Sequence, residues 1–102
     1  MGSPMRIRAA VDGEVIEVKV LMRHEMETGR RKGPDGELVP ALFIKEVVAD
    51  YEGKRVFTGH WGAAVSKNPF LSFRFKGAAG GKVTVTWTDT SGDTRTDEAS
   101  VS

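Results

Sequence analysis

Two histidines and a methionine are the side chains of this sequence best suited to bind a transition metal. His24 and Met26 lie two positions apart, and His60 lies further along the chain. Imidazole and thioether groups are copper ligands, so these three residues could form a small redox site. A blue-copper centre also needs a cysteine thiolate, and the chain has no cysteine. We therefore expect no metal or other cofactor, and a metal-binding redox domain is the alternative function.

The remaining motifs of catalytic type are incomplete. Residues 77–82 read GAAGGK, which is one residue short of a phosphate-binding loop, and Val83 replaces the hydroxyl residue that such a loop requires. No Gly-x-Ser-x-Gly elbow is present to activate a serine. Asp89, Asp93 and Asp97 surround a turn without the spacing of a calcium loop, so we expect them to be solvated. The sequence thus predicts a glycine-rich turn at 77–82 and no enzyme activity.

Arg30, Arg31 and Lys32 form the one basic cluster that could contact a partner. The chain has 15 basic and 14 acidic residues and a formal net charge of +1. Such a balance provides no strong field for nucleic acid or for an anionic membrane. No apolar run approaches the ~18 residues that span a bilayer. We therefore expect no nucleic-acid or membrane partner, and we assign this cluster to a solvated loop or to a protein contact.

Length and composition predict a single domain. The chain has 102 residues, of which 39% are hydrophobic, enough for one core. The absence of cysteine excludes disulfides and cysteine nucleophiles. Residues 1–4, MGSP, precede a second methionine, and we expect them to be an expression remnant before a domain that spans 5–102.

Alternating apolar and polar residues predict about seven short strands. The dipeptide Asp12-Gly13 predicts a type I′ turn after the first of them. Lys45-Glu46 interrupts the alternation of the third, which indicates a bulge or an edge position. From His24 to Val39 the apolar periodicity is lost, which predicts a long basic loop. The predicted strands lie near residues 6–11, 16–22, 42–51, 55–61, 71–75, 83–88 and 94–99.

These strands predict an all-β, immunoglobulin-like sandwich of about seven antiparallel strands, with a closed barrel as the second choice. No window has helical periodicity. Without a disulfide, the core must come from apolar packing, and the expected core residues are Val18, Phe73, Phe75, Val85 and Trp87.

The aromatic residues exceed what one inner face of a small sandwich must bury. Phe57 and Trp61 share a strand face that need not be the core face. A second apolar face indicates a partner protein.

Three segments together resemble the Z subunits of the SoxYZ complex of the bacterial thiosulfate-oxidising (Sox) system. They are residues 24–29 (HEMETG) with the following Arg31-Lys32, residues 61–73 (WGAAVSKNPFLSF) and residues 92–99 (GDTRTDEA). The resemblance extends over nearly the whole chain. One departure is Glu25, where the family often has proline, so the local loop conformation can differ.

The resemblance implies an immunoglobulin-like sandwich and a non-catalytic role. In that family the SoxY subunit carries sulfur intermediates on a cysteine near its C-terminus, and the Z subunit is its non-covalent partner. A chain without cysteine fits the partner role, because the covalent adduct needs a thiolate. The resemblance also implies a periplasmic heterodimer, exported with the signal-bearing Y subunit, that makes transient contacts with Sox enzymes. We expect an isolated chain to form homodimers through its exposed edges.

Two surfaces are the predicted contact sites. The hypothetical interface with the Y subunit consists of Phe57, Trp61, Lys67, Asn68, Pro69 and Phe70. The hypothetical docking loop for the Sox enzymes contains His24, Met26, Arg30, Arg31 and Lys32.

Overall fold

The computed structural model describes residues 3–102, and the regular secondary structure in that range is entirely β-strand. The described residues contain no helix that is long and apolar enough to cross a membrane. Residues 1 and 2 of the predicted N-terminal remnant lie outside the described range. The strands are β1 (Arg6–Asp12), β2 (Val15–Leu21), β3 (Ile44–Tyr51), β4 (Lys54–His60), β5 (Phe70–Lys76), β6 (Lys82–Asp89) and β7 (Thr94–Ser100).

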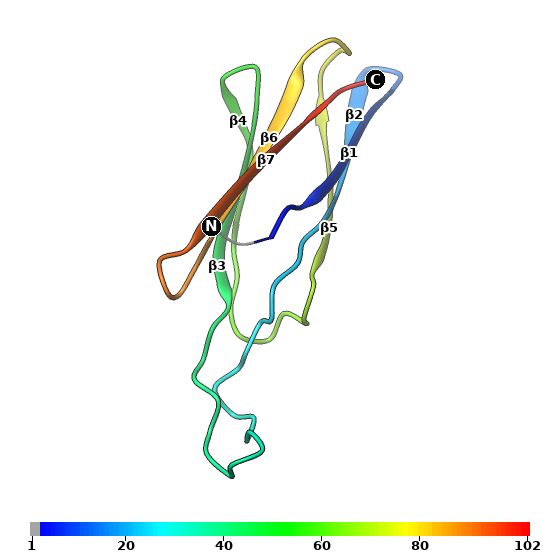
Figure 1. The fold of residues 1–102 in the computed structure, drawn as a ribbon. Coiled ribbons are helices and arrows are strands. Elements are labelled where there is room, and N and C mark those ends of the chain that lie inside the picture. Colours follow the sequence, from blue (N-terminus) through cyan, green and yellow to red (C-terminus); the bar gives the residue numbers. More distant parts are fainter. Residues whose placement is uncertain (1–2) are drawn as a thin grey trace.

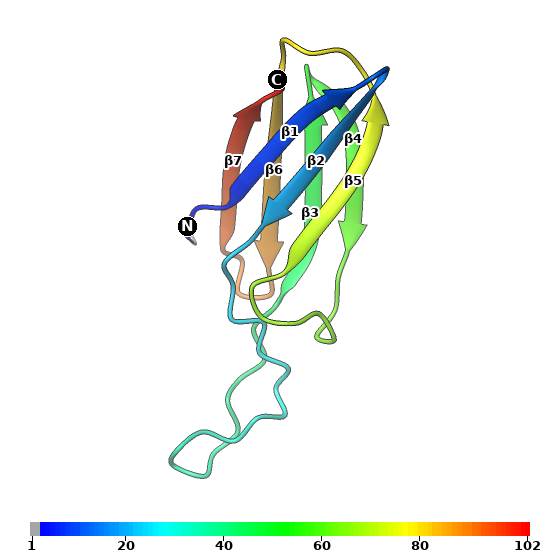
Figure 2. The same cartoon turned by 90° about the vertical axis from the view of Figure 1, so that its right-hand side faces the viewer.

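The strands form two antiparallel sheets packed face to face (Figure 1). One sheet has the order β1-β2-β5, and the other has the order β4-β3-β6-β7. The predicted immunoglobulin-like sandwich is confirmed. In a constant-type immunoglobulin domain the fourth strand pairs with the fifth, whereas here β4 pairs with β3. This arrangement leaves β4 and β5 as edge strands on the same side of the sandwich (Figure 2).

The core lies between the sheets and follows the predicted alternation. In β2 and β6 every second residue is buried, because successive side chains of a strand point to opposite faces. Of the predicted core residues, Val18, Val85 and Trp87 are fully buried, whereas Phe73 and Phe75 are half-buried. The fully buried large side chains are Ile16, Val18, Val20, Met22, Ile44, Val47, Val83, Val85 and Trp87.

The hairpin turns differ in one respect from the prediction. The first turn consists of Gly13 and Glu14, and Gly13 alone has a positive φ, of 67°. That conformation fits a type II′ turn, so the predicted type I′ turn at Asp12-Gly13 is wrong. The turn between β3 and β4 has a positive φ at both Glu52 and Gly53, as a type I′ turn requires.

The irregularity predicted at Lys45-Glu46 is present. The pairing of β3 with β6 shifts its register between Ile44 and Glu46, as a bulge does. The edge position that was the other interpretation is wrong, because β3 pairs with β4 on one side and with β6 on the other.

The two lateral edges of the sandwich, where one sheet meets the other, are held together by different contacts. On one side, the main chain of β1 bonds to the C-terminal residues: the Val11 amide donates to the Ser102 carbonyl, and the Ser102 amide donates to the Ala9 carbonyl. On the other side, side chains bridge the edge strands β4 and β5, and the ring of Phe57 stacks on that of Phe73 with 4.8 Å between centroids. We call this second side the open edge.

Residues 22–43 leave the sandwich and form a projecting arm (Figure 1). The two halves of the arm pair through main-chain bonds between Glu27 and Leu42 and from the Val39 amide to the Arg31 carbonyl. The molecule is 53 Å long and about 20 Å across, and a seven-residue strand spans only about 23 Å, so the arm accounts for much of the length. The predicted loop is therefore a narrow hairpin.

Candidate functional site

The alternation of β2 continues into the arm for three more buried residues. Met22, His24 and Met26 are buried, whereas Arg23 and Glu25 between them are exposed. The sequence predicts a loss of apolar periodicity from His24 onward. The period of two was nevertheless present at positions 22, 24 and 26, and it identifies the residues that anchor the arm.

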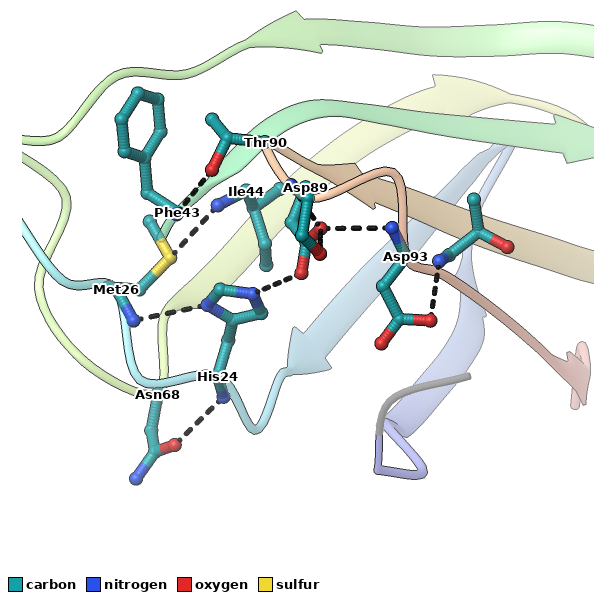
Figure 3. Close-up of polar contacts among 10 residues, drawn as sticks. His24, Met26, Phe43, Ile44, Asn68, Asp89, Thr90 and Asp93 are labelled. Carbon is teal, nitrogen blue, oxygen red and sulfur yellow. Dashed lines mark hydrogen bonds and ion pairs between the residues drawn. The ribbon is translucent and has the colours of Figure 1, made fainter. Parts of the chain in front are cut away.

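His24 bonds to one polar group on each side of its ring (Figure 3). Its Nε2 lies 3.0 Å from Oδ2 of Asp89, at the end of β6, and its Nδ1 accepts a hydrogen bond of 3.1 Å from the Met26 amide. An acceptor at Nδ1 requires the proton to sit on Nε2, so His24 donates to Asp89. The ring also packs edge-to-face on Trp87, with 5.1 Å between centroids.

Asp89 is the centre of this buried cluster. Its Oδ1 accepts hydrogen bonds from the Ser91 amide at 2.9 Å, the Ser91 hydroxyl at 2.6 Å and the Asp93 amide at 3.0 Å. Burial favours a raised pKa for Asp89, but the bonds from Ser91 and His24 outweigh it and hold the pKa below its ordinary value. The prediction that Asp89 is solvated is therefore wrong: the residue is 3% exposed, because its own turn and His24 supply enough donors to compensate its desolvation.

Asp97 is also less solvated than predicted. It is half-buried and accepts a hydrogen bond of 2.9 Å from the Met5 amide. The guanidinium of Arg95 bonds to both of its carboxylate oxygens and lowers the pKa of Asp97, against the opposing effect of burial. The bond from the Met5 amide to Asp97 ties the start of the domain to β7.

Asn68 connects the base of the arm to the segment before β5. Its side-chain Oδ1 accepts a bond of 3.1 Å from the His24 amide, and its own amide donates to the His24 carbonyl at 2.9 Å. Asn68 has a φ of 52°, a left-handed conformation that asparagine tolerates better than most residues. On the opposite side, Sδ of Met26 lies 3.3 Å from the Ile44 amide. The base of the arm thus bonds to β3, to β6 and to the loop that precedes β5.

The hydrogen bonds of this cluster support a structural role, which is to hold the base of the arm in place. Ser91 bonds to Asp89 and not to His24, so the histidine is not placed to activate the hydroxyl as a general base.

The three residues proposed as metal ligands are not assembled. Both ring nitrogens of His24 have protein partners, and the sulfur of Met26 faces the Ile44 amide. His60 is exposed and lies 3.9 Å from Glu46. Within residues 3–102 no group of three or more His, Cys, Asp or Glu side chains could hold a metal ion. The arrangement therefore gives no support to the metal-binding alternative.

The predicted docking loop divides into buried and exposed parts. His24 and Met26 are buried and hold the arm. Arg31 forms bidentate hydrogen bonds with Glu27, four residues earlier, which lower the pKa of Glu27. Arg30 and Lys32 are exposed. These two side chains and the outer side of Arg31 are the basic groups of this cluster that the arm presents to solvent.

The side chains of the predicted interface residues point in different directions. Phe57 and Trp61 pack against the core at the open edge with Gly59 between them, where an added Cβ would lie 3.1 Å from the Phe57 ring. Their shared face is thus turned toward the interior, and its rings are half-exposed at the edge. Phe70 points outward from the β1-β2-β5 sheet and is 62% exposed.

The predicted interface residues in the loop before Phe70 contact the arm or are buried. Lys67 is exposed and forms an ion pair of 3.4 Å with Glu25 of the arm. Asn68 bonds to His24, as described above, and Pro69 is buried.

A solved structure and a family model are similar to this chain. Among solved structures, a point variant of a superoxide reductase (neelaredoxin) from Archaeoglobus fulgidus, in the reduced form, is similar with a TM-score of 0.56. The two share 21% identity over 99% of this chain and 87% of the other, which supports the fold alone. No curated protein sequence is similar enough to count as a match.

A family model matches residues 5–100, and its description is "Sulphur oxidation protein SoxZ". The match covers nearly the whole domain, including the base of the arm and the open edge. The chain belongs to the SoxZ family and is a component of a sulphur-oxidising (Sox) system.

Proposed function

We propose that this chain is the non-catalytic subunit of a SoxYZ-type carrier complex in periplasmic thiosulfate and sulfur oxidation. In this role it binds the SoxY subunit, whose C-terminal cysteine carries the sulfur intermediates, and helps to present that cysteine to Sox enzymes. The observation that carries the proposal is the match to the SoxZ family along residues 5–100 of a chain that has no cysteine.

The division of chemistry between two subunits has a physical reason. A covalent sulfur adduct needs a thiolate, and thiolates exchange readily with disulfides and persulfides. A partner without thiols can hold the carrier subunit without capturing the intermediate. The buried polar cluster at the base of the arm is consistent with this holding role. Its groups bond to one another and keep the arm in a fixed position.

The open edge is the surface that we assign to the SoxY subunit. It has two edge strands, β4 and β5, whose outer main-chain groups are available to another chain. Half-buried Phe57, Trp61 and Phe73 lie along it, and burial of such rings against a partner is a major source of affinity. Export of a folded pair requires a stable interface, of roughly 2,000 Å² or more.

The arm is the surface that we assign to transient contacts with Sox enzymes. It projects from the sandwich (Figure 2), and its exposed Arg30 and Lys32 are free of ion pairs within residues 3–102. Exposed charges on a protruding segment favour fast, weak association over permanent assembly.

Co-expression with a SoxY subunit tests the first assignment. We expect a stable heterodimer by size-exclusion chromatography with light scattering, and self-association of the chain when it is expressed alone. Trp61→Ala is expected to weaken the heterodimer at least tenfold, because a buried aromatic anchor typically costs about 2 kcal/mol or more. His60→Ala is the matched control, since His60 is the exposed neighbour. A monomer that does not bind SoxY would overturn the proposed function.

Charge reversal on the arm tests the second assignment. Arg30→Glu with Lys32→Glu should slow turnover of the assembled carrier by Sox enzymes and leave the heterodimer intact. Unchanged turnover would reject the arm as the docking element. For localisation, fractionation of cells that express the chain with and without SoxY is expected to find it in the periplasm only when SoxY is present.

A further inference from the structure

The two outer faces of the sandwich differ in how their charges are balanced. On the β4-β3-β6-β7 sheet, Lys82 pairs with Glu98 and Arg55 with Asp50. On the β1-β2-β5 sheet, Arg6 and Arg8 are exposed and have no acidic partner within residues 3–102. The second face therefore retains positive charge that the protein itself does not neutralise.

Two exposed apolar side chains lie beside these arginines. Leu21 and Phe70 are opposite each other in the register of β2 and β5, and they are 41% and 62% exposed. They are two of the three large apolar side chains exposed in the described part of the chain. We call this region the Leu21–Phe70 patch, and it is formed by Arg6, Arg8, Lys19, Leu21 and Phe70.

The register of the strands explains why the patch is both apolar and basic. Arg6 lies opposite Leu21 in β1 and β2, and Arg8 lies opposite Lys19 in the next outward row. Glu17, two positions before Lys19 in β2, bonds to Arg74 at 2.8 Å and lies 3.8 Å from Lys19. Glu17 is thus shared between two cations.

The side chains of the patch enclose a shallow hollow of about 230 Å³. That volume is below the usual range of small-molecule pockets, about 300–1,000 Å³, and is of the size that suits one large side chain. A rigid sheet with a hollow also differs from the protruding apolar tips that insert into lipid. Shape and charge therefore both favour a protein segment as the occupant.

We propose that the Leu21–Phe70 patch binds an acidic segment of a partner protein, which places one aromatic or aliphatic side chain in the hollow against Leu21 and Phe70. The carboxylates on either side of that anchor pair with Arg6 and Arg8, for which bidentate guanidinium–carboxylate geometry is available. Charge complementarity gives the contact its selectivity, and the apolar anchor fixes its register.

This surface faces a different direction from the side chains assigned to SoxY. Phe57 and Trp61 point into the sandwich at the open edge, whereas Phe70 and Leu21 point outward from the β1-β2-β5 sheet. Because Phe70 belongs to β5, one of the two edge strands, the patch borders the open edge, and SoxY bound there would lie beside it. Binding of an acidic segment to the patch is tested on this chain alone and does not depend on the proposed function.

Peptide binding to the full chain tests the proposal. The probe is a fluorescent peptide with a single phenylalanine among aspartates and glutamates, and the controls replace the phenylalanine by alanine or the acids by their amides. We expect saturable anisotropy changes that weaken with salt, and amide shifts in NMR spectra confined to the first residues of β1, the end of β2 and the start of β5. Both control peptides should bind at least fivefold more weakly.

Substitutions on the patch give the decisive comparison. Arg6→Glu with Arg8→Glu should weaken the peptide by about tenfold or more, since attraction becomes repulsion, and Phe70→Ser should do so without changing net charge. The matched control is Lys45→Glu with Lys54→Glu, which makes the same change in net charge from exposed positions of the other sheet. All the substituted residues, in the patch and in the control, are solvent-exposed, so each variant should retain the wild-type melting curve.

Two outcomes would overturn the proposal. Equal losses in the patch variant and in its charge control would mean that the peptide responds only to net charge. Binding to phosphatidylglycerol vesicles that depends on Phe70, with no binding of the acidic peptide, would assign the patch to a lipid surface instead.

Discussion

Replacement of Asp89 by asparagine should strongly destabilise the domain, although the two side chains have almost the same shape. The hydrogen bonds around Asp89 run in one direction: the Met26 amide donates to His24, His24 donates to Oδ2, and Ser91 and Asp93 donate to Oδ1. A carboxylate accepts at both oxygens, whereas an amide must donate at one position.

Neither orientation of the new amide satisfies this cluster. With its NH₂ group toward His24, two donors face each other, and the other histidine tautomer would oppose the Met26 amide instead. With its NH₂ group toward the turn, it meets the amides of Ser91 and Asp93. Each arrangement leaves a buried donor without an acceptor, which costs about 1–3 kcal/mol, and the lost charge weakens the remaining bonds.

We therefore expect Asp89→Asn to lower the free energy of unfolding by about 2–4 kcal/mol. For a domain of this size that corresponds to a fall in melting temperature of roughly 10–25 °C. Urea titrations followed by circular dichroism measure the change directly. The control is Asp12→Asn at the exposed end of β1, which should change stability by less than about 0.5 kcal/mol.

The pH dependence provides a second measurement. Asp89 has a folded pKa below its unfolded value, so its stabilising contribution is complete above the unfolded pKa of about 3.9 and is lost as the pH falls through the folded pKa. Wild type should therefore lose stability below about pH 4 more steeply than Asp89→Asn. The reasoning would be refuted by a change below about 0.5 kcal/mol, or by an equal penalty in a His24→Ala background, where the opposed donor is absent.

Three smaller effects can be measured with the same assays. Phe57→Ala and Phe73→Ala should each lower the free energy of unfolding by about 2–3 kcal/mol. Their double-mutant cycle should give a coupling energy of about 0.5–1.5 kcal/mol, because the two rings stack at the open edge. Strictly additive losses would show that the stacked rings are not coupled. Asn68→Ala should destabilise the domain more than Asn68→Gly, because both variants lose the side-chain bond to His24 but only glycine keeps the φ of 52° without strain. The reverse order would show that backbone strain at this position does not control the stability. Arg31→Ala should change global stability by less than about 1 kcal/mol but increase hydrogen exchange at the amide of Glu27, and unchanged exchange would mean that the exposed pair does not hold the arm.

The fold could be predicted from the sequence because its strands have one buried face. Alternation identified the strands of both sheets, and the residues Val18, Val85 and Trp87 were correctly placed in the core. The interruption at Lys45-Glu46 correctly indicated a bulge. Local patterning contains this information, since the side-chain period of a strand is two and a bulge shifts it by one.

The polar cluster at the base of the arm could not be predicted in the same way. His24 and Asp89 are 65 positions apart, and each is of a residue type that is usually exposed when found in a turn or loop. Their burial depends on donors that come together only after β2, β3 and β6 have packed. The turn at 91–93 offered a partial signal, because an aspartate followed by a serine two residues later commonly accepts bonds from its own turn.

The pairing of β4 with β3 links the architecture to the proposed role. Had β4 joined β5, as in a constant-type immunoglobulin domain, one sheet would have covered the rings of Phe57 and Phe73 with continuous main-chain bonds. Instead, each strand ends its own sheet and the rings between them are half-exposed. A monomer with such an edge is prone to pair with other chains. In the proposed role this property is useful, because SoxY would cover the edge. The same argument predicts that binding of SoxY protects the outer amides of β4 and β5 from hydrogen exchange and leaves those of β1 unchanged.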